Sequence, residues 1–398
     1  MVNRLTVLLA TPFRLFFLTA TIFGCAAMGL WVPVLLGLHG WSGAMPASIW
    51  HGHEMVFGYT MAVLAGFLLT AAANWTGTPP WRGKPLALLG LLWLAGRIAV
   101  NCSGCLPPVL TAIIDLSFIP ALGVMLAIPL IATGNRRQYV FLVFLTLLTV
   151  ANLLVHLEAL GVVTNGGHIG LILAVDLLMA IISVMGGRVI PAFTTNALRQ
   201  QGETILPKAH AWQERLALAL MILLAVLDVV AETSPACALT ALVAAMVQGL
   251  RLAGWRGHRT LGQPILWVLH LGFGWLVIGL FLKFIVTWFP GIPTSSALHA
   301  LTIGVVGTLT LGMMSRVSLG HTGRAFLAGP FAVAAFVMIT ASALLRVITP
   351  WLPANEAVTD QTIWLFALAG LLWMASLAAF VIGHGGILTS PRVDGRPG

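Results

Sequence analysis

The sequence predicts an all-α integral membrane protein with about twelve transmembrane helices, and three observations support this fold class. First, 59% of the 398 residues are hydrophobic and only 8% are charged, whereas about a quarter of the residues are charged in an ordinary soluble domain. Second, apolar runs of about 20 residues, enough to cross a bilayer, follow one another along the chain. Third, lysine and arginine are concentrated in every second connection. We therefore expect the lipid bilayer to surround most of the chain.

The helices are placed by the apolar runs between clusters of glycine, proline and charge. The first run, from Leu15 to about Leu38, is longer than the core of a signal peptide, so we expect it to be retained. All twelve helices are expected in a single transmembrane domain over residues 1–398. They are predicted near residues 13–38, 49–73, 85–103, 108–132, 138–158, 166–190, 208–231, 235–254, 263–287, 294–318, 327–348 and 361–385.

The distribution of positive charge indicates the topology of these helices. If both termini are cytoplasmic, 17 of the 20 lysine and arginine residues fall on the cytoplasmic side, as the positive-inside rule requires. Only Arg97, Lys283 and Arg346 lie elsewhere, inside or at the outer end of a span, where a charge needs a specific partner. The net charge of +9 follows this topology, so we expect no nucleic-acid partner.

A weak internal repeat relates helices 2, 6 and 10. A shift of 246 residues places His53 on His299 and residues 66–77 on residues 312–323, and a poorer third copy aligns at Arg188. Three four-helix repeats are one explanation. Chance similarity among helices rich in glycine, alanine and leucine is the other.

Histidine is the strongest chemical signal, because five of the eleven histidines fall at the outer ends of four different helices. Neutral imidazole is a ligand for haem iron and copper, and metal sites in helix bundles take ligands from facing helices. A structural role at the membrane interface is the alternative for each histidine alone. The candidate metal ligands are these five and one histidine in the other half of helix 9: His51, His53, His156, His168, His299 and His270.

The start of helix 2 carries two histidines and a carboxylate in an apolar run. His51 and Glu54 share a helix face, whereas His51 and His53 point about 200° apart, so one centre cannot easily take both histidines. We expect His53 to ligate a metal, and Glu54 to orient His51 or to serve a second centre. If helices 2 and 10 face each other, His53 and His299 suit the two axial positions of a haem.

Four other polar residues are candidates for supporting roles. Arg188 and Arg316 lie near cytoplasmic helix ends, where they either bind a carboxylate, such as a haem propionate, or serve as positive-inside anchors. Asn152 is one turn before His156 and is expected to hydrogen-bond that imidazole. Asp176 is a carboxylate inside a span and needs a partner.

Cysteine adds little to this assignment. Cys102 and Cys105 form a C-x-x-C pair at the outer end of helix 3, which is consistent with a disulfide or with Cu(I) binding. The sequence has no P-loop, Rossmann fingerprint, HExxH or CxxCH motif. Any haem is therefore bound non-covalently.

Several segments, taken together, resemble the NnrS family of bacterial membrane proteins. The most specific is the histidine-rich stretch His51-Gly-His-Glu-Met-Val-Phe-Gly58 followed by Asn74-Trp-Thr-Gly77. Further similarity lies in residues 65–70, 94–97, 186–194 and 299–304, so the resemblance spans nearly the whole chain. It implies a twelve-helix inner-membrane protein that contains non-covalent haem b and copper. It also implies a role in nitric oxide metabolism, such as denitrification, or in protection from nitrosative stress.

The helix number and the histidines also resemble the core subunit of haem-copper oxidases and nitric oxide reductases. However, the sequence has no adjacent His-His pair and no His-Pro-Glu motif. The copper site of those enzymes therefore cannot be transferred to this chain, and the likeness concerns architecture alone.

We accordingly expect a membrane haem/copper protein that binds or turns over nitric oxide near the periplasmic side, with an electron donor that the sequence does not identify. A secondary transporter for a metal, haem or small anion is the alternative, since twelve helices and internal repeats also describe many transporters. Broken helices would favour it, and Pro120 and Pro129 are the only obvious interruptions. A cofactor-free sensor or assembly factor is the third possibility.

Overall fold

The protein is an all-α polytopic membrane protein, as predicted. The computed structural model describes residues 3–289, 291–352 and 356–396, and no strand occurs among them. Within these residues, eleven helices are long and apolar enough to cross a membrane. The remaining predicted helix also forms, as α10 (Ala211–Ala231), but its 21 residues include Glu214, Arg215 and Asp228.

The contacts divide the chain into two compact units. The first unit comprises residues 1–174, 316–326 and 377–398, and the second comprises residues 175–315 and 327–376. Helices α9, α14 and α16 each contribute to both units. Each unit is described by itself below, and the single transmembrane domain stays a prediction.

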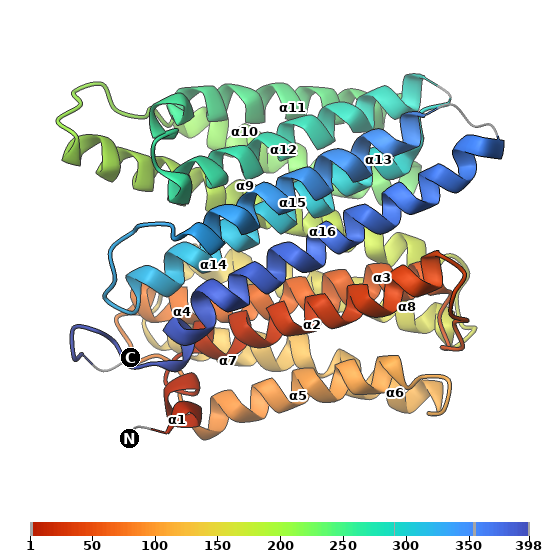
Figure 1. The fold of residues 1–398 in the computed structure, drawn as a ribbon, viewed down its shortest axis with the longest axis horizontal. Coiled ribbons are helices and arrows are strands. Elements are labelled where there is room, and N and C mark those ends of the chain that lie inside the picture. The colour runs from red at the N-terminus through yellow and green to blue at the C-terminus, as the bar shows by residue number, and fades with distance from the viewer. Residues whose placement is uncertain (1–2, 290, 353–355, 397–398) are drawn as a thin grey trace. The chain divides into compact units, whose positions relative to one another are not determined.

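In the first unit, α2 packs against α4, α4 against α7, α7 against α8, and α5 against α6 (Figure 1). Proline occupies the first turn of α2, α5 and α6, where its missing N–H leaves no hydrogen bond unmade. The helices of this unit are α1 (Arg4–Leu8), α2 (Pro12–Leu35), α3 (Ala47–His53), α4 (Met61–Thr76), α5 (Lys84–Asn101), α6 (Pro108–Leu116), α7 (Phe118–Ala132), α8 (Tyr139–Ala159), the start of α9 (Gly166–Gln200) and the ends of α14 (Thr308–Gly320) and α16 (Glu356–Thr389).

The span predicted at 108–132 is divided into α6 and α7 at Ser117. Pro120 causes this break, because it has no N–H to donate to the carbonyl of Leu116 and its ring clashes there. Pro129 lies inside α7 without ending it. The break places Asp115 in the last turn of α6.

Two π-helical turns interrupt spans in the two units. The turn η1 (Glu54–Thr60) joins α3 to α4, and the turn η4 (Ala300–Gly307) joins α13 to α14. Each begins directly after a histidine, His53 or His299, and these are the two histidines that the 246-residue shift superimposes. The π-helix is rare and appears mostly as single turns, which are frequent at functional sites. Their matched positions favour the repeat of helices 2 and 10 over chance similarity.

In the second unit, α11 packs against both α10 and α12, and η4 packs against α12 and α15. The Ser234 side chain caps α11 by accepting a hydrogen bond from the Cys237 N–H, at 3.1 Å. The helices that contribute are the remainder of α9, α10, α11 (Pro235–Gly254), α12 (Pro264–Trp288), α13 (Thr294–His299), α14 (Thr308–Gly320), α15 (Pro330–Ile348) and α16 (Glu356–Thr389).

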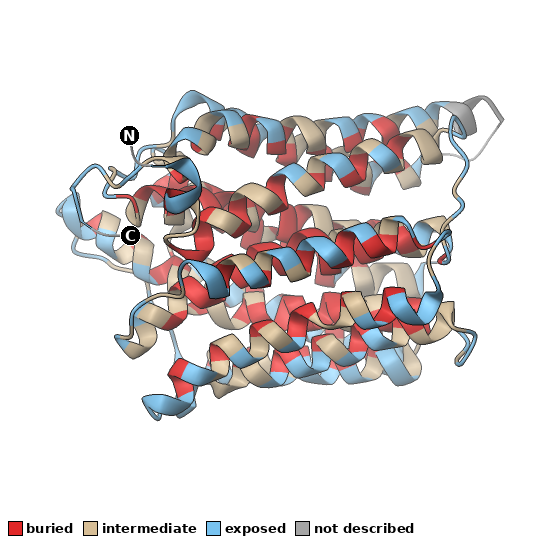
Figure 2. Ribbon diagram, turned by 90° about the horizontal axis from the view of Figure 1, so that it is seen from below, coloured by how far each residue is buried: buried red, intermediate tan, exposed pale blue. Residues whose placement is uncertain are grey.

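Burial alternates around the helices. Figure 2 shows buried stripes along them, with exposed positions on their other faces. Large apolar side chains occupy many of the exposed positions, among them Leu88, Leu91, Ile98 and Ile113. Exposed apolar surface of this extent suits contact with lipid and not with water.

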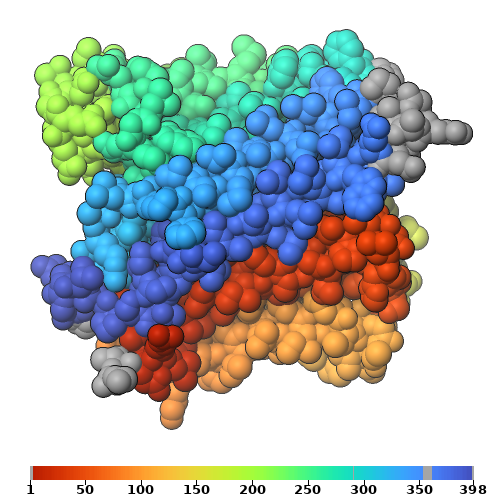
Figure 3. All heavy atoms as spheres, in the orientation of Figure 1, coloured from red at the N-terminus to blue at the C-terminus, as the bar shows by residue number. Residues whose placement is uncertain are grey.

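Segments near the beginning and the end of the chain pack together in the first unit. Figure 3 shows the last turns of α16 beside the start of α2. The Arg14 guanidinium, which is fully buried, donates hydrogen bonds to the carbonyls of Leu388, at 2.9 Å, and Ser390, at 2.7 Å. A cation at the carboxyl end of a helix is stabilised by the unpaired carbonyls there.

Candidate functional site

A buried polar cluster lies near one end of the first unit. Its side chains come from α3, η1, α5, α6 and α8. Counted along its helix at a rise of 1.5 Å per residue, each residue lies within about 12 Å of a helix end. We call this the imidazole cluster. It consists of His53, Glu54, Arg97, Asp115, Asn152 and His156, all less than 5% exposed.

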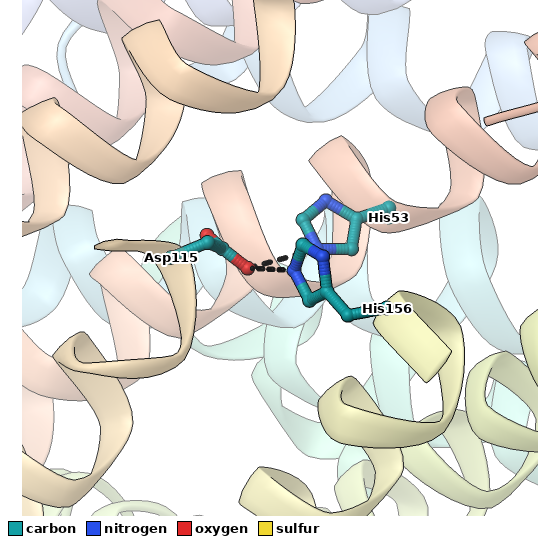
Figure 4. Close-up of side chains that lie close together, drawn as sticks. All are labelled: His53, Asp115 and His156. Carbon is teal, nitrogen blue, oxygen red and sulfur yellow. Dashed lines mark hydrogen bonds and ion pairs between the residues drawn. The ribbon is translucent and has the colours of Figure 1, made fainter. Parts of the chain in front are cut away.

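Asp115 is at the centre of the imidazole cluster. Its Oδ2 atom lies 3.1 Å from Nε2 of His53 and 2.8 Å from Nε2 of His156 (Figure 4). The Asn152 amide donates a further hydrogen bond to the same oxygen, at 2.8 Å. Three side chains from two helices therefore converge on one carboxylate oxygen.

Both ring nitrogens of His53 face acceptor oxygens. Nδ1 lies 3.0 Å from Oε1 of Glu54, and Nε2 lies 2.9 Å from Oδ1 of Asn152 as well as near Asp115. In this arrangement both nitrogens act as donors, which an imidazole does only when it carries two hydrogens. A metal ion at Nε2 would replace one of these hydrogens.

Arg97 joins the two carboxylates. Its guanidinium donates through Nη1 to Glu54 and through Nη2 to Asp115, and Nδ2 of Asn101 donates to the other Glu54 oxygen at 3.0 Å. Two carboxylates and one guanidinium leave a net charge of −1. Because an uncompensated charge in a buried site is costly, a proton on His53 or a metal cation is needed to balance it.

Two glycines allow the helices to approach closely enough for these contacts. A Cβ at Gly96 would lie 3.0 Å from Oδ1 of Asp115 and 3.3 Å from its Cα, and a Cβ at Gly58 would lie 3.1 Å from Arg97 Nη1. The Gly58 carbonyl also accepts a hydrogen bond from Nε1 of Trp93, at 3.0 Å. The absence of side chains here lets α5 pack against α6 and η1.

The donor set suits a redox metal. His53, Asp115 and His156 can each offer one ligand atom, and these atoms all lie within 4.8 Å of one another. Two imidazoles and a carboxylate are typical ligands of copper and of non-haem iron. Glu54 lies at the other ring nitrogen of His53. Metal-bound imidazoles commonly hydrogen-bond a carboxylate at this position.

The predicted supporting residues have different partners from those expected. Glu54, expected to orient His51 or to serve a second centre, contacts His53. Asn152, expected to contact His156, contacts His53 and Asp115. Glu54 begins the π-helical turn directly after His53, and its carboxylate reaches the ring of this neighbouring residue.

The other predicted ligands of the first unit lie outside the cluster. The ring of His51 stacks on Trp31, with centroids 4.4 Å apart and an interplanar angle of 12°. His168, in the first turn of α9, is exposed. Whether either histidine binds a metal stays a prediction.

The predicted ligands of the second unit have contacts of their own. Nδ1 of His299 lies 2.8 Å from the carbonyl oxygen of Ser295, and Nε2 of His270 lies 2.9 Å from Oγ1 of Thr194. Since His53 and His299 belong to different units, their pairing as axial haem ligands stays a prediction.

The predicted anion-binding arginines are half-buried or buried. Arg188 is half-buried in α9. Arg316 is buried, and its guanidinium lies over the ring of Phe326, 4.2 Å from the centroid. Arg316 lies near the end of α14, as expected, whereas Arg188 lies inside α9, which continues to Gln200 and not to residue 190 as predicted. Binding of a propionate by either stays a prediction.

The three basic residues that lie outside the predicted cytoplasmic side each have a partner, as expected. Arg97 binds Glu54 and Asp115, and Lys283 forms an ion pair with Asp228. The Arg346 guanidinium lies over the Phe366 ring, 4.2 Å from its centroid.

The C-x-x-C thiols remain unassigned. Cys102 and Cys105 are both exposed and are not joined by a disulfide. They follow α5 directly after Asn101, and binding of Cu(I) there stays a prediction.

Asp115 is the member of the cluster that sequence reasoning missed. The available signal was a lone carboxylate in an otherwise apolar run, five residues before the proline that breaks the helix. Arg97 was noticed as a charge in need of a partner, but the sequence did not identify that partner.

Comparison with known protein families identifies the family of the chain. A family model described as NnrS protein matches residues 7–392. The chain belongs to the NnrS family. This confirms the resemblance found in the motifs, and it covers both units of this NnrS-family protein. No curated protein matches the sequence.

Proposed function

We propose that this NnrS-family protein binds nitric oxide at a copper ion, the metal that the family resemblance implies, held by the imidazole cluster. The observation that carries the proposal is the convergence of His53, Asp115 and His156 within 4.8 Å in a buried site. Family membership supports a nitric-oxide-related haem or copper protein in general terms. In the topology predicted from charge, the cluster lies near the periplasmic side of the inner membrane, with both termini in the cytoplasm.

The chain's own residues have distinct roles in this proposal. His53 and His156 bind the metal through Nε2, and Asp115 supplies an oxygen ligand. Glu54 accepts the Nδ1–H of His53 and so fixes the ring, while Arg97 holds the Glu54 and Asp115 carboxylates in place. The bound metal would supply a one-electron redox centre for a small diatomic ligand. Burial of every ligand keeps bulk water away.

Haem is proposed at a different histidine. Both ring nitrogens of His53 are already engaged in the cluster, which suits a small ion better than a porphyrin. Nδ1 of His299 is directed at the Ser295 carbonyl, and a hydrogen bond of this kind commonly orients a metal-binding imidazole. We propose His299 as a ligand of non-covalent haem b, with Arg188 or Arg316 as candidate partners of a propionate.

The test is metal analysis and spectroscopy of detergent-purified protein. Copper and iron are quantified, and optical spectra are recorded oxidised, reduced and with nitric oxide. We expect His53→Ala and His156→Ala to lose copper, and His299→Ala to lose haem bands. His39→Ala removes an exposed histidine and is the matched control, which should keep both. Unchanged copper in both cluster variants would refute the proposed site.

The secondary transporter stays the alternative, and one experiment separates it from the metal protein. Protein reconstituted in liposomes is assayed for uptake of copper, haem or a small anion. Uptake by protein that contains no stoichiometric metal would favour the transporter. Stoichiometric metal that responds to nitric oxide would favour the proposal above.

A further inference from the structure

A second group of buried charges lies in the second unit and contains no imidazole. Its side chains come from four consecutive helices, α9 to α12. Asp176 is 2% exposed and Asp228 is 5% exposed. We call these two residues the carboxylate pair, and Lys283 and Cys237 contact it.

Asp228 has two donors. The Lys283 ammonium lies 2.5 Å from Oδ2 of Asp228, and the Cys237 thiol donates to Oδ1 at 3.0 Å. Both oxygens of Asp228 are therefore stabilised as a carboxylate. Lys283, at the end of α12, is only 15% exposed.

Asp176 has no comparable donors. Among the described residues, no N–H or O–H donor reaches its buried Oδ2 atom. The carboxyl group of Asp228 is close to it. Two carboxyl groups can share a hydrogen bond only when one of them carries a proton, because an ionised carboxylate has no hydrogen to donate.

The charge balance points in the same direction. Two carboxylates and one ammonium would leave a net charge of −1 inside the unit, and a single proton makes the group neutral. A metal ion fits poorly, because the Lys283 ammonium already occupies the cationic position beside Asp228. A proton on Asp176 balances the charge, and it gives this buried carboxyl group a hydrogen that it can donate to Asp228.

We propose that the carboxylate pair is a membrane-embedded proton-binding site, in which Asp176 holds a proton and donates it to Asp228. Glu232 connects this site to the surface. It follows Asp228 by four residues, and so lies on the same face of α10, and it is half-buried at the end of that helix. A proton therefore exchanges between Asp176 and the aqueous phase by way of Asp228 and Glu232.

Infrared spectroscopy of the full-length protein tests this site, because a protonated carboxyl group gives a C=O band that an ionised one lacks. Spectra are recorded at neutral pH in H2O and D2O, with helix content measured for every variant. Wild type should show a buried carboxyl band that shifts in D2O. Asp176→Asn, which keeps the size of the side chain, should lose that band. Asp394→Asn, at an exposed position outside the helices, should keep it.

A second variant distinguishes proton binding from a purely structural role. Lys283→Met removes the positive charge, so both carboxyls must be protonated to stay neutral, and a second buried carboxyl band should appear. A structural role alone predicts no new band. Absence of any buried carboxyl band that depends on Asp176 would overturn the proposal. Loss of the wild-type band on addition of Na⁺ at constant pH would also overturn it, since that result identifies a metal cation as the ligand.

Discussion

Each unit contains a cluster of two buried carboxylates and one cationic side chain, but the two clusters balance the remaining negative charge differently. In the first unit, Glu54 and Asp115 share Arg97, and two imidazoles face the pair. In the second unit, Asp228 binds Lys283, and no imidazole is among the described contacts of the carboxylate pair. Imidazoles can exchange a proton for a metal ion, whereas a carboxyl pair with an ammonium suits a proton. The neighbouring groups thus decide what a buried carboxylate pair binds.

The largest expected effect comes from removing the shared cation of the first unit. Arg97→Met, studied with a chelator present, leaves Glu54 and Asp115 without their guanidinium and should lower the free energy of unfolding by about 3–5 kcal/mol. Lys283→Met should have a smaller effect, because a second proton can replace the ammonium charge. Denaturant titration in mixed micelles measures both. An effect of Lys283→Met equal to that of Arg97→Met would contradict the distinction between the units.

A smaller loss of stability is expected when a side chain is introduced at the contact between α5 and α6. Gly96→Ala places a Cβ 3.0–3.3 Å from Asp115, and such overpacking typically costs about 1–3 kcal/mol. Copper content should fall as well, because Asp115 must move. Gly249→Ala is the control, since its Cβ would meet only Val277, at 3.6 Å, and helix propensity should make it neutral or stabilising. Equal stability and copper content of the two variants would rule out close packing as the determinant of the cluster.

The smallest effect concerns His321, which follows α14 in the first unit. Burial, and then the positive charge of Arg392, lower the pKa of this imidazole below its usual range. The unfolded chain therefore takes up a proton near pH 6.5 that the folded chain does not. The contribution of His321 to the free energy of unfolding should therefore be fully present above about pH 6.5. It should be lost as the pH falls toward the lower pKa of the folded state.

The measurement is the thermal unfolding midpoint at several pH values, compared with His321→Gln and with His39→Gln as the control. Below neutral pH the unfolding midpoint should decrease less in His321→Gln than in wild type. In the control it should decrease as much as in wild type. An unchanged pH dependence in His321→Gln would show that this histidine does not contribute to the loss of stability at low pH.

The spans of this protein could be predicted from sequence because each is an apolar run of bilayer length, and α11 begins and ends where expected, at residues 235 and 254. His53 and His156 could be proposed as a pair because the topology gave both the same depth. Depth alone does not fix which way a side chain points. Each residue turns a helix by about 100°, so depth did not identify the contact between His53 and Glu54. The sequence also did not single out Asp115, which the break before Pro120 places in the last turn of α6.

The central claim is that His53 and His156 hold one metal ion together. Electron paramagnetic resonance of copper-loaded protein tests it most directly, because each ligating nitrogen splits the Cu(II) signal. A pattern from two imidazole nitrogens is expected in wild type and in His39→Ala. When excess Cu(II) is added back to His156→Ala, the copper that it binds should show a pattern from one imidazole nitrogen. A pattern that is the same in wild type and in His156→Ala would contradict it.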